Sequence, residues 1–243
     1  MHLPTKRVVD VLTLLAPEKR GKRLCEISVI LSIPKGTLSP ILDTLLAEKL
    51  ISKRGDYYFG GTELFALGST VVENIPYKDM IRAELRALSD LVGETCYLGI
   101  LDGGDVLYLD KADSTNPLRM LTGVGHKLPA YATGVGKALI MDKTSEELFA
   151  LYPNGFDKLT DKTVTRPEEI FSSLALYNSR GYSEEVEEST EYIRCFGAPI
   201  KKDGKTVAAI SVAIPTFRYK EEERDTYVES LLNAANRLGR LWV

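Results

Sequence analysis

The sequence has little of the raw material for disulfide, metal or acid–base chemistry. Three cysteines, Cys25, Cys96 and Cys195, lie far apart and are odd in number, which argues against a disulfide framework and matches no zinc-binding spacing. Only two histidines are present, and one of them, His2, lies beside the N-terminus. A histidine-based zinc site or catalytic triad therefore has almost no candidates. We expect no catalytic residue, no metal and no cofactor.

The sequence also lacks a long apolar run. No stretch approaches the roughly 20 apolar residues that cross a bilayer. The first 25 residues mix charged and apolar side chains and have no signal-peptide cleavage pattern. We therefore expect a cytoplasmic protein without a membrane partner. The 243 residues, 44% of them apolar, suffice for one small and one medium domain.

The net charge of −3 conceals a small positive excess near the N-terminus. Residues 1–75 carry ten Lys or Arg and eight Asp or Glu, whereas the remaining residues carry 21 and 26. The basic residues form two groups, which are Lys19, Arg20, Lys22 and Arg23, and then Lys53 and Arg54. Such groups neutralise nucleic-acid phosphates, although they are equally typical of solvated loops.

Apolar spacing in the first 60 residues predicts three short helices followed by a hairpin. The helices are expected at 7–16, at 24–31 and from about 35 to 49. Two short strands, 51–54 and 56–59, flank a Gly55-Asp56 turn. Three helices and a hairpin in this order are the layout of a winged helix-turn-helix.

The third predicted helix contains Pro40, which removes a backbone hydrogen bond and costs about 3 kcal/mol in a helix interior. Two outcomes remain open: the helix bends at Pro40, or it begins there with Ser39 as its cap.

In a helix-turn-helix, the second helix enters the DNA major groove and the wing follows the neighbouring backbone. The candidate DNA-binding residues are Arg23, Lys35, Thr37, Ser39, Thr44, Lys53 and Arg54. The same layout also serves as a protein-interaction module, so a module that has lost DNA binding stays open as an alternative.

Residues 62–72 again have a helical pattern, and Asn74-Ile75-Pro76 interrupts it. We therefore expect a winged domain at 1–61, a linker helix at 62–76 and a second domain at 77–243. The second domain mixes both element types, which predicts helices flanking a largely antiparallel sheet, an α+β fold. The expected strands are 95–101, 105–111, 183–187, 194–201 and 206–214, and the expected helices are 77–91, 133–141, 145–151, 167–179 and 221–241.

An ordered set of motifs resembles the IclR (isocitrate lyase regulator) family of bacterial transcription factors. The motifs cover nearly the whole chain and lie at 24–38, 58–68, 125–138, 159–163, 180–188 and 194–199. The segment at 125–138, GHKLPAYATGVGKA, is similar to the most recognisable motif of the family's ligand-binding domain.

The resemblance implies a winged helix-turn-helix, a linker helix and a C-terminal GAF-like α/β domain that binds an effector. It also implies a homodimer or homotetramer that binds an inverted-repeat operator in double-stranded DNA, as a repressor or activator, under the control of a small organic acid or aromatic compound. The family commonly has a basic residue where this chain has Pro40.

The resemblance also implies an effector pocket. The matching residues are Met120, Leu128, Gly134, Val135, Glu185, Ile193, Cys195, Ser211 and Ala213. Gly134 and Gly136 are expected to let the backbone approach a ligand closely. Val135, Glu185 and Ala213 depart from the family's usual residues, which indicates a reshaped, slightly less polar pocket that still suits a small acid.

Two other interpretations of these positions remain open. Apolar members of the set, such as Leu128 and Ile193, are also typical of ordinary core packing. A cysteine redox sensor is a further alternative, because Cys96 and Cys195 lie in the same expected domain.

Overall fold

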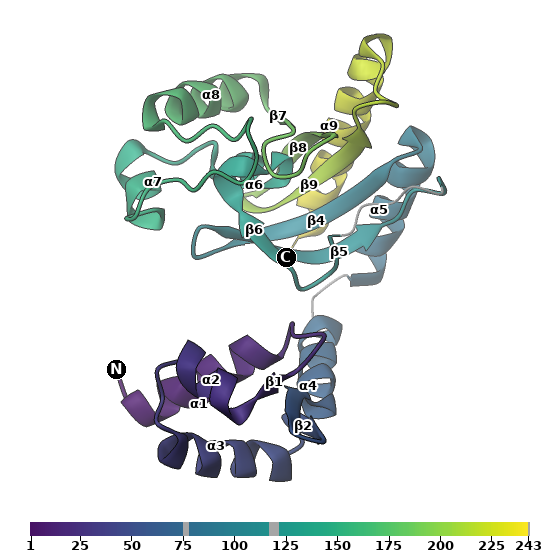
Figure 1. Cartoon of the computed structure of the whole chain (residues 1–243). Coiled ribbons are helices and arrows are strands. Elements are labelled where there is room, and N and C mark those ends of the chain that lie inside the picture. Colours follow the sequence, from purple (N-terminus) through teal and green to yellow (C-terminus); the bar gives the residue numbers. More distant parts are fainter. Residues whose placement is uncertain (75–77, 117–121, 243) are drawn as a thin grey trace. The chain divides into compact units, whose positions relative to one another are not determined.

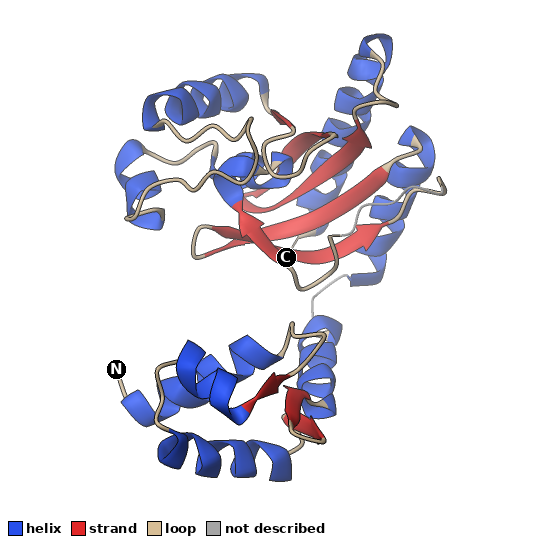
Figure 2. Cartoon of the chain, in the orientation of Figure 1, coloured by secondary structure: helices blue, strands red, loops and turns tan. Residues whose placement is uncertain are grey.

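The chain forms two compact units, Met1–Ile75 and Pro76–Val243. The computed structural model describes residues 1–74, 78–116 and 122–242 (Figure 1). The expected fold class, α+β with an N-terminal winged helix-turn-helix and a C-terminal GAF-like α/β domain, is confirmed (Figure 2).

Three helices and a small antiparallel sheet build the N-terminal unit. The elements are α1 (Leu3–Leu15), β1 (Lys22–Arg23), α2 (Leu24–Ile30), α3 (Lys35–Ala47), β2 (Ile51–Arg54), β3 (Tyr57–Gly60) and α4 (Thr62–Glu73). The strands are ordered β1-β3-β2. The core of the unit consists of Val11, Leu15, Ile27, Ile33, Leu38, Leu42, Leu45, Ile51 and Tyr58. Strand β1 has only two residues, too few for the sequence pattern to indicate it.

The break between α2 and α3 turns the chain by 116°, which lies within the range of about 90–120° that is typical of a helix-turn-helix. Ser32 adopts a positive φ of 53°, and the Ser28 hydroxyl donates to the carbonyl of Ile33 at 2.7 Å. The wing is the β2–β3 hairpin, in which Arg54 pairs with Tyr57 across a turn where Gly55 has a φ of 58°.

Helix α3 begins at Lys35 and includes Pro40, so the expectation of a late start at Ser39 is wrong. The first turn is already closed before the proline, because the Pro34 carbonyl accepts from the amides of Thr37 and Leu38. Pro40 and Gly36 are both exposed, so the carbonyl that loses its helical partner lies on the solvated side. Burial of the opposite face holds the helix together.

The apolar side chains of helix α4 are not buried by other parts of the described chain. None of its residues is buried, and Phe65, Leu67 and Val71 are 80%, 54% and 69% exposed.

An antiparallel sheet forms the centre of the C-terminal unit. In the described part of the chain it has six strands, ordered β6-β5-β4-β9-β8-β7. Their bounds are β4 (Thr95–Asp102), β5 (Asp105–Ala112), β6 (Lys127–Pro129), β7 (Ser183–Val186), β8 (Ile193–Lys202) and β9 (Lys205–Pro215). The expected strands are present within about one residue at each end, whereas β6, a three-residue strand ending in proline, had no pattern to indicate it.

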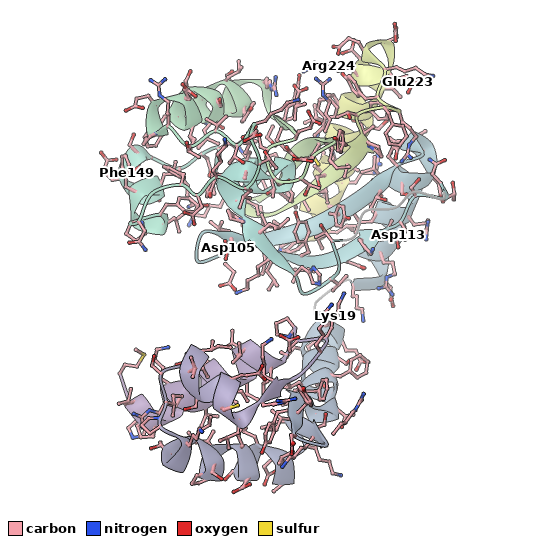
Figure 3. All side chains as sticks on the ribbon, viewed as in Figure 1. Lys19, Asp105, Asp113, Phe149, Glu223 and Arg224 are labelled. Atoms are coloured by element: carbon pink, nitrogen blue, oxygen red, sulfur yellow. The ribbon has the colours of Figure 1, made fainter. Side chains whose placement is uncertain are left out.

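Helices cover both faces of this sheet (Figure 1). One face packs against α5 (Lys78–Val92) and α9 (Arg224–Leu241), and the other against α6 (Gly134–Ile140). Two further helices, α7 (Ser145–Leu151) and α8 (Pro167–Arg180), contribute to the core on the α6 side. Short 3-10 turns at Ala130–Ala132 and Glu221–Glu223 precede α6 and α9. Helix α9 therefore begins at Arg224, three residues later than expected, directly after Glu223 (Figure 3).

Among the described residues, no single helix is long and apolar enough to span a membrane. The bent pair α2 and α3 meets the length and composition criteria only when the two helices are taken together.

Replacement of Pro40 by alanine is expected to stabilise α3. The new amide restores the hydrogen bond to the Gly36 carbonyl, and the free energy of unfolding of this helix should rise by about 2 kcal/mol, after an offset from the more flexible unfolded chain. Amide hydrogen exchange in residues 38–47 of the full chain measures this change, and it should slow. Pro34→Ala is the control, because Pro34 precedes the helix and removes no helical hydrogen bond. Unchanged exchange in Pro40→Ala would contradict the account of α3.

Candidate ligand cavity and nucleic-acid interface

A small cavity lies between the sheet of the C-terminal unit and the start of α6. Its lining consists of Tyr97, Tyr108, Thr122, Leu128, Thr133, Gly134, Val135, Ser189, Thr190, Ile193, Cys195, Ser211 and Ala213. Seven of the nine residues expected in the effector pocket are in this lining. Of the other two, Glu185 lies beside Cys195, and Met120 lies outside the described residues.

Strand register brings the cavity residues together from distant parts of the sequence. Tyr97 of β4 pairs with Ser211 of β9, and Cys195 of β8 pairs with Ala213 two residues further along β9. Residues directly opposite one another, and residues two apart on one strand, share a face of the sheet. All four side chains therefore lie on the face that α6 covers.

Close packing fixes the start of α6 above this face. Thr133 caps the helix by accepting from the Gly136 amide at 3.0 Å. A Cβ atom on Gly134 would lie 2.6 Å from Cβ of Cys195, and one on Gly136 would lie 2.4 Å from Cα of Ala130. Both glycines are therefore required for the packing of α6 against its neighbours. Gly134 also lines the cavity, so its contact with a ligand stays a prediction.

A buried polar cluster adjoins the cavity. Lys137 of α6 donates to the Glu188 carboxylate, and both side chains are less than 10% exposed. Glu185 is 1% exposed, and its carboxylate accepts from the Glu188 amide at 2.8 Å and from the Ser189 hydroxyl at 3.3 Å. Burial raises the pKa of Glu185 to about 7, so this carboxyl changes its charge near neutral pH.

Cys195 is a protonated thiol beside this carboxyl. Burial, reinforced by the neighbouring Glu185, raises its pKa well above the ordinary value of 9.0, and burial also raises the pKa of Cys96. Both are consequently poor nucleophiles. Cys96 pairs with Val212, whereas Cys195 pairs with the adjacent residue of β9, so the two thiols point to opposite faces of the sheet. The alternative of a redox sensor formed by pairing Cys96 with Cys195 is therefore wrong.

Six hydroxyl-bearing residues of the lining were not anticipated from the sequence. They are Tyr97, Tyr108, Thr122, Thr133, Ser189 and Thr190. The alternation of β5 contained a signal for Tyr108, whereas Tyr97 lies in a part of β4 that is buried on both faces and does not alternate. Ser189 and Thr190 lie in a loop, where no periodicity indicates which side chain points inward.

The loop between β7 and β8 closes one side of the cavity. It runs from Glu187 to Tyr192, and both of these residues have positive φ angles, 59° and 64°. The Glu187 amide donates to the Ile193 carbonyl at 2.7 Å and joins the two ends of the loop. The enclosed volume is only about 20 Å³, close to the space needed by one water molecule.

In the N-terminal unit, α3 exposes a narrow face. Lys35, Gly36, Pro40, Asp43 and Thr44 are exposed on it. Two other residues expected to contact DNA, Thr37 and Ser39, are only partly exposed. Helix α3 thus offers fewer polar side chains to the solvent than the sequence suggested.

The cationic side chains of the wing form cation–π contacts with aromatic rings. Lys53 lies over the ring of Tyr58 and Arg54 over that of Phe59, each with its charged group 5.1 Å from the ring centroid. Arg23 stacks on Tyr57 in the same way, at 4.7 Å. Such contacts limit side-chain freedom while leaving the charge able to meet a phosphate. In the other basic group, Lys22 forms an ion pair with Glu18 at 2.5 Å, which lowers the net charge available there.

Comparisons with known proteins agree with this two-part architecture. The family model described as "Bacterial transcriptional regulator IclR C-terminal" matches residues 69–240. The HTH-type transcriptional regulator KdgR of Escherichia coli (strain K12) is 31% identical over 229 residues, covering 91% of this chain and 86% of that protein.

Two solved structures share the fold over nearly the whole chain. An IclR transcriptional regulator from Alicyclobacillus acidocaldarius has a TM-score of 0.87, with 22% identity and 100% of both chains covered. An IclR homologue from Microbacterium hydrocarbonoxydans, solved in complex with 4-hydroxybenzoate, has a TM-score of 0.77, with 20% identity and coverage of 98% and 99%.

Glu185→Gln is expected to change how the stability of the chain depends on pH. Because the pKa of Glu185 is about 7 in the folded chain and near 4.5 when unfolded, the folded state binds more protons between these values. Stability from this group therefore falls as the pH rises from about 5 to 7 and stays low above 7. The glutamine variant should lose this fall and melt at a higher temperature than the parent at pH 8.

Thermal unfolding measured from pH 5 to 8 tests this expectation. The charged or titratable neighbours of Glu185 are Lys137 on α6, Glu188 in the following loop, Cys195 on β8 and Tyr108 on β5. All of them are retained in the variant. Glu168→Gln, at an exposed position on α8, is the matched control and should keep the parent profile. Identical profiles for parent and Glu185→Gln would show that Glu185 does not titrate in this range.

Proposed function

Since the chain belongs to the IclR family of bacterial transcriptional regulators, we propose that α3 and the β2–β3 wing bind operator DNA and that the cavity beneath α6 binds the controlling ligand. The chain is a ligand-controlled, DNA-binding transcriptional regulator, as its family membership establishes. The observation that carries the assignment of the ligand site is the convergence of seven of the expected residues on one cavity.

The proposed effector is a small organic acid or an aromatic compound. The cavity has hydroxyl groups from several strands and loops, with Leu128, Val135 and Ile193 as apolar wall, a combination suited to orienting a small polar molecule. The 4-hydroxybenzoate complex of the Microbacterium hydrocarbonoxydans homologue supports this class of ligand. The proposed contact set is Met120, Leu128, Gly134, Val135, Glu185, Ile193, Cys195, Ser211 and Ala213.

Ligand entry requires the cavity to enlarge, because about 20 Å³ accommodates little more than a water molecule. The loop from Glu187 to Tyr192 is the proposed moving part. Its tip supplies Ser189 and Thr190 to the lining, and its two ends are the residues with positive φ. Movement of this tip changes the cavity while Glu188 keeps its ion pair with Lys137 of α6.

The proposed DNA contacts are Arg23, Lys35, Thr37, Ser39, Thr44, Lys53 and Arg54. The cations of the wing are proposed to contact the DNA phosphates, and side chains of α3 are proposed to contact the base edges in the major groove. The cation–aromatic stacking in the wing supports the phosphate role, since it holds charges in place on an exposed edge. Family membership favours this assignment over a protein-interaction module without DNA binding.

We propose that two chains associate through α4 to bind an inverted repeat, with a homotetramer as the larger assembly. Leu67 and Val71 lie on neighbouring turns of this helix, and both are exposed. An apolar stripe of this kind is usually buried against a second surface. In this scheme residues 1–61 bind DNA, residues 62–76 form the linker between the two domains, and residues 77–243 bind the effector. A change in the linker alters the spacing of the two winged domains, which must match a DNA turn of roughly 34 Å.

The double substitution Lys53→Ala with Arg54→Ala is expected to weaken DNA binding and its dependence on salt. Each lost phosphate contact should reduce the slope of log affinity against log salt by about 1. Titration of the promoter DNA upstream of the chain's own gene at several salt concentrations measures the slope. Lys143→Ala, in the other unit, is the control and should leave it unchanged. Absence of any salt-dependent, sequence-specific binding by the parent chain would contradict the proposed function.

Ser211→Ala is expected to weaken ligand binding while leaving DNA binding intact. A thermal-shift screen of small carboxylic and aromatic acids, 4-hydroxybenzoate included, identifies a stabilising compound. At 100 times its dissociation constant, a ligand adds about 2.7 kcal/mol to the stability of the folded chain. The variant should lose much of this gain, whereas Ser172→Ala, exposed on α8, should retain it. If no acid shifts the parent chain, the proposed ligand class is wrong.

A further inference from the structure

Helix α3 has an unusual composition for a helix that reads DNA bases. Its thirteen residues, KGTLSPILDTLLA, include no Arg, Asn, Gln or His. The side chains that pair with two atoms of a guanine or adenine edge are Arg, Lys, Asn and Gln. Only Lys35, at the first position of α3, belongs to this group. Beyond its first residue, α3 has no side chain for this kind of purine recognition.

Pro40 and Thr44 occupy the middle of the exposed face. They are one helical turn apart, and the Thr44 hydroxyl donates to the Pro40 carbonyl at 2.9 Å. This bond commits the hydroxyl proton of Thr44 to the helix itself and leaves its γ-methyl group as an outward contact. The ring of Pro40 presents only carbon atoms, because proline has no backbone N–H. The centre of the face is thus apolar, although it is exposed to the solvent.

The apolar feature of the DNA major groove is the C5-methyl group of thymine, which threonine methyl groups and other small apolar side chains contact. We infer that α3 reads thymine methyl groups through the ring of Pro40 and the γ-methyl of Thr44, so that each operator half-site has thymine at the two positions that these residues meet. This inference rests on the proposed function, since it requires that α3 enters the major groove.

The charges around the two residues agree with this type of readout. Asp43 is exposed beside them, and a carboxylate there disfavours close approach to phosphates and accepts from a base amino group. The cations that are proposed to contact the phosphates, Lys53 and Arg54, lie on the wing instead. Affinity and sequence recognition are therefore divided between the wing and α3.

The test compares thymine with deoxyuridine, which differs from it only by the C5-methyl group. Binding sites are first selected from random DNA with the full chain. Each thymine of the selected half-site is then replaced by deoxyuridine, one at a time. Binding should weaken about fourfold at one or two thymines of each half-site, the effect of losing one buried methyl contact. Substitution at the remaining thymines should have no effect.

Three variants connect the effect to particular side chains. Thr44→Ser keeps the hydroxyl and removes the methyl group, so the loss at one thymine should disappear. Thr44→Val keeps a methyl group and removes the hydroxyl, so the loss should persist. Pro40→Ala reduces the apolar surface from a ring to one methyl group, so the loss at the other thymine should become smaller. Because this last variant is expected to strengthen α3, weaker discrimination there is not explained by unfolding, and hydrogen exchange in α3 verifies this.

The outcomes separate this inference from the function on which it depends. Selection that yields no preferred sequence overturns specific DNA binding itself. A preferred sequence whose recognition is insensitive to deoxyuridine overturns only the readout by Pro40 and Thr44. A deoxyuridine effect that is the same in Thr44→Ser, Pro40→Ala and the parent chain assigns the methyl contact to other residues and also overturns it.

Discussion

The close approach of α6 to β8 is the constraint on which the C-terminal unit depends. A Cβ atom on Gly197 would lie 2.2 Å from the carbonyl oxygen of Gly134, so neither element tolerates a larger residue without moving apart. The Ser183 hydroxyl donates to the same carbonyl at 2.6 Å. Three segments distant in the sequence thereby meet within a few ångströms. The position of α6 then determines which side chains of the sheet remain uncovered and line the cavity.

The same packing explains why charged groups are buried there. Helix α6 carries Lys137 into the interior, where Glu188 compensates its charge. Among the described residues, Glu185 forms no ion pair. The hydrogen bonds to Glu185 come from a backbone amide and a serine hydroxyl. These bonds offset only part of the cost of burying a carboxylate, so its proton is held more tightly than in water.

The sequence predicted most of the fold because its signals are local. Alternating strands, Gly55 in the wing and the apolar faces of α1 to α3 follow from spacing and turn chemistry. The winged layout and seven cavity residues could also be predicted, the latter through the family resemblance. Strand β6 could not, because three residues contain no period. Nor could the opposite orientations of Cys96 and Cys195, which depend on the pairing of three strands.

Pro40 marks another limit of reasoning from sequence. Its local cost suggested a bend or a later start, yet buried residues on the opposite face of α3 outweigh one missing hydrogen bond. Ser189 and Thr190 were missed for the reverse reason, since a loop has no pattern from which to infer which side chains face inward. In both cases tertiary packing decides what local propensity leaves undetermined.

The glycine contacts that fix α6 also determine how the cavity deforms. One wall is formed by α6 and β8. These two elements are in close contact at Gly134 and Gly197, so this wall cannot move inward and is rigid. Another part of the wall is the short loop between β7 and β8, whose end residues, Glu187 and Tyr192, occupy a costly backbone region. Under the proposed function, a molecule that expands this cavity therefore displaces Ser189 and Thr190 at the tip of the loop rather than α6.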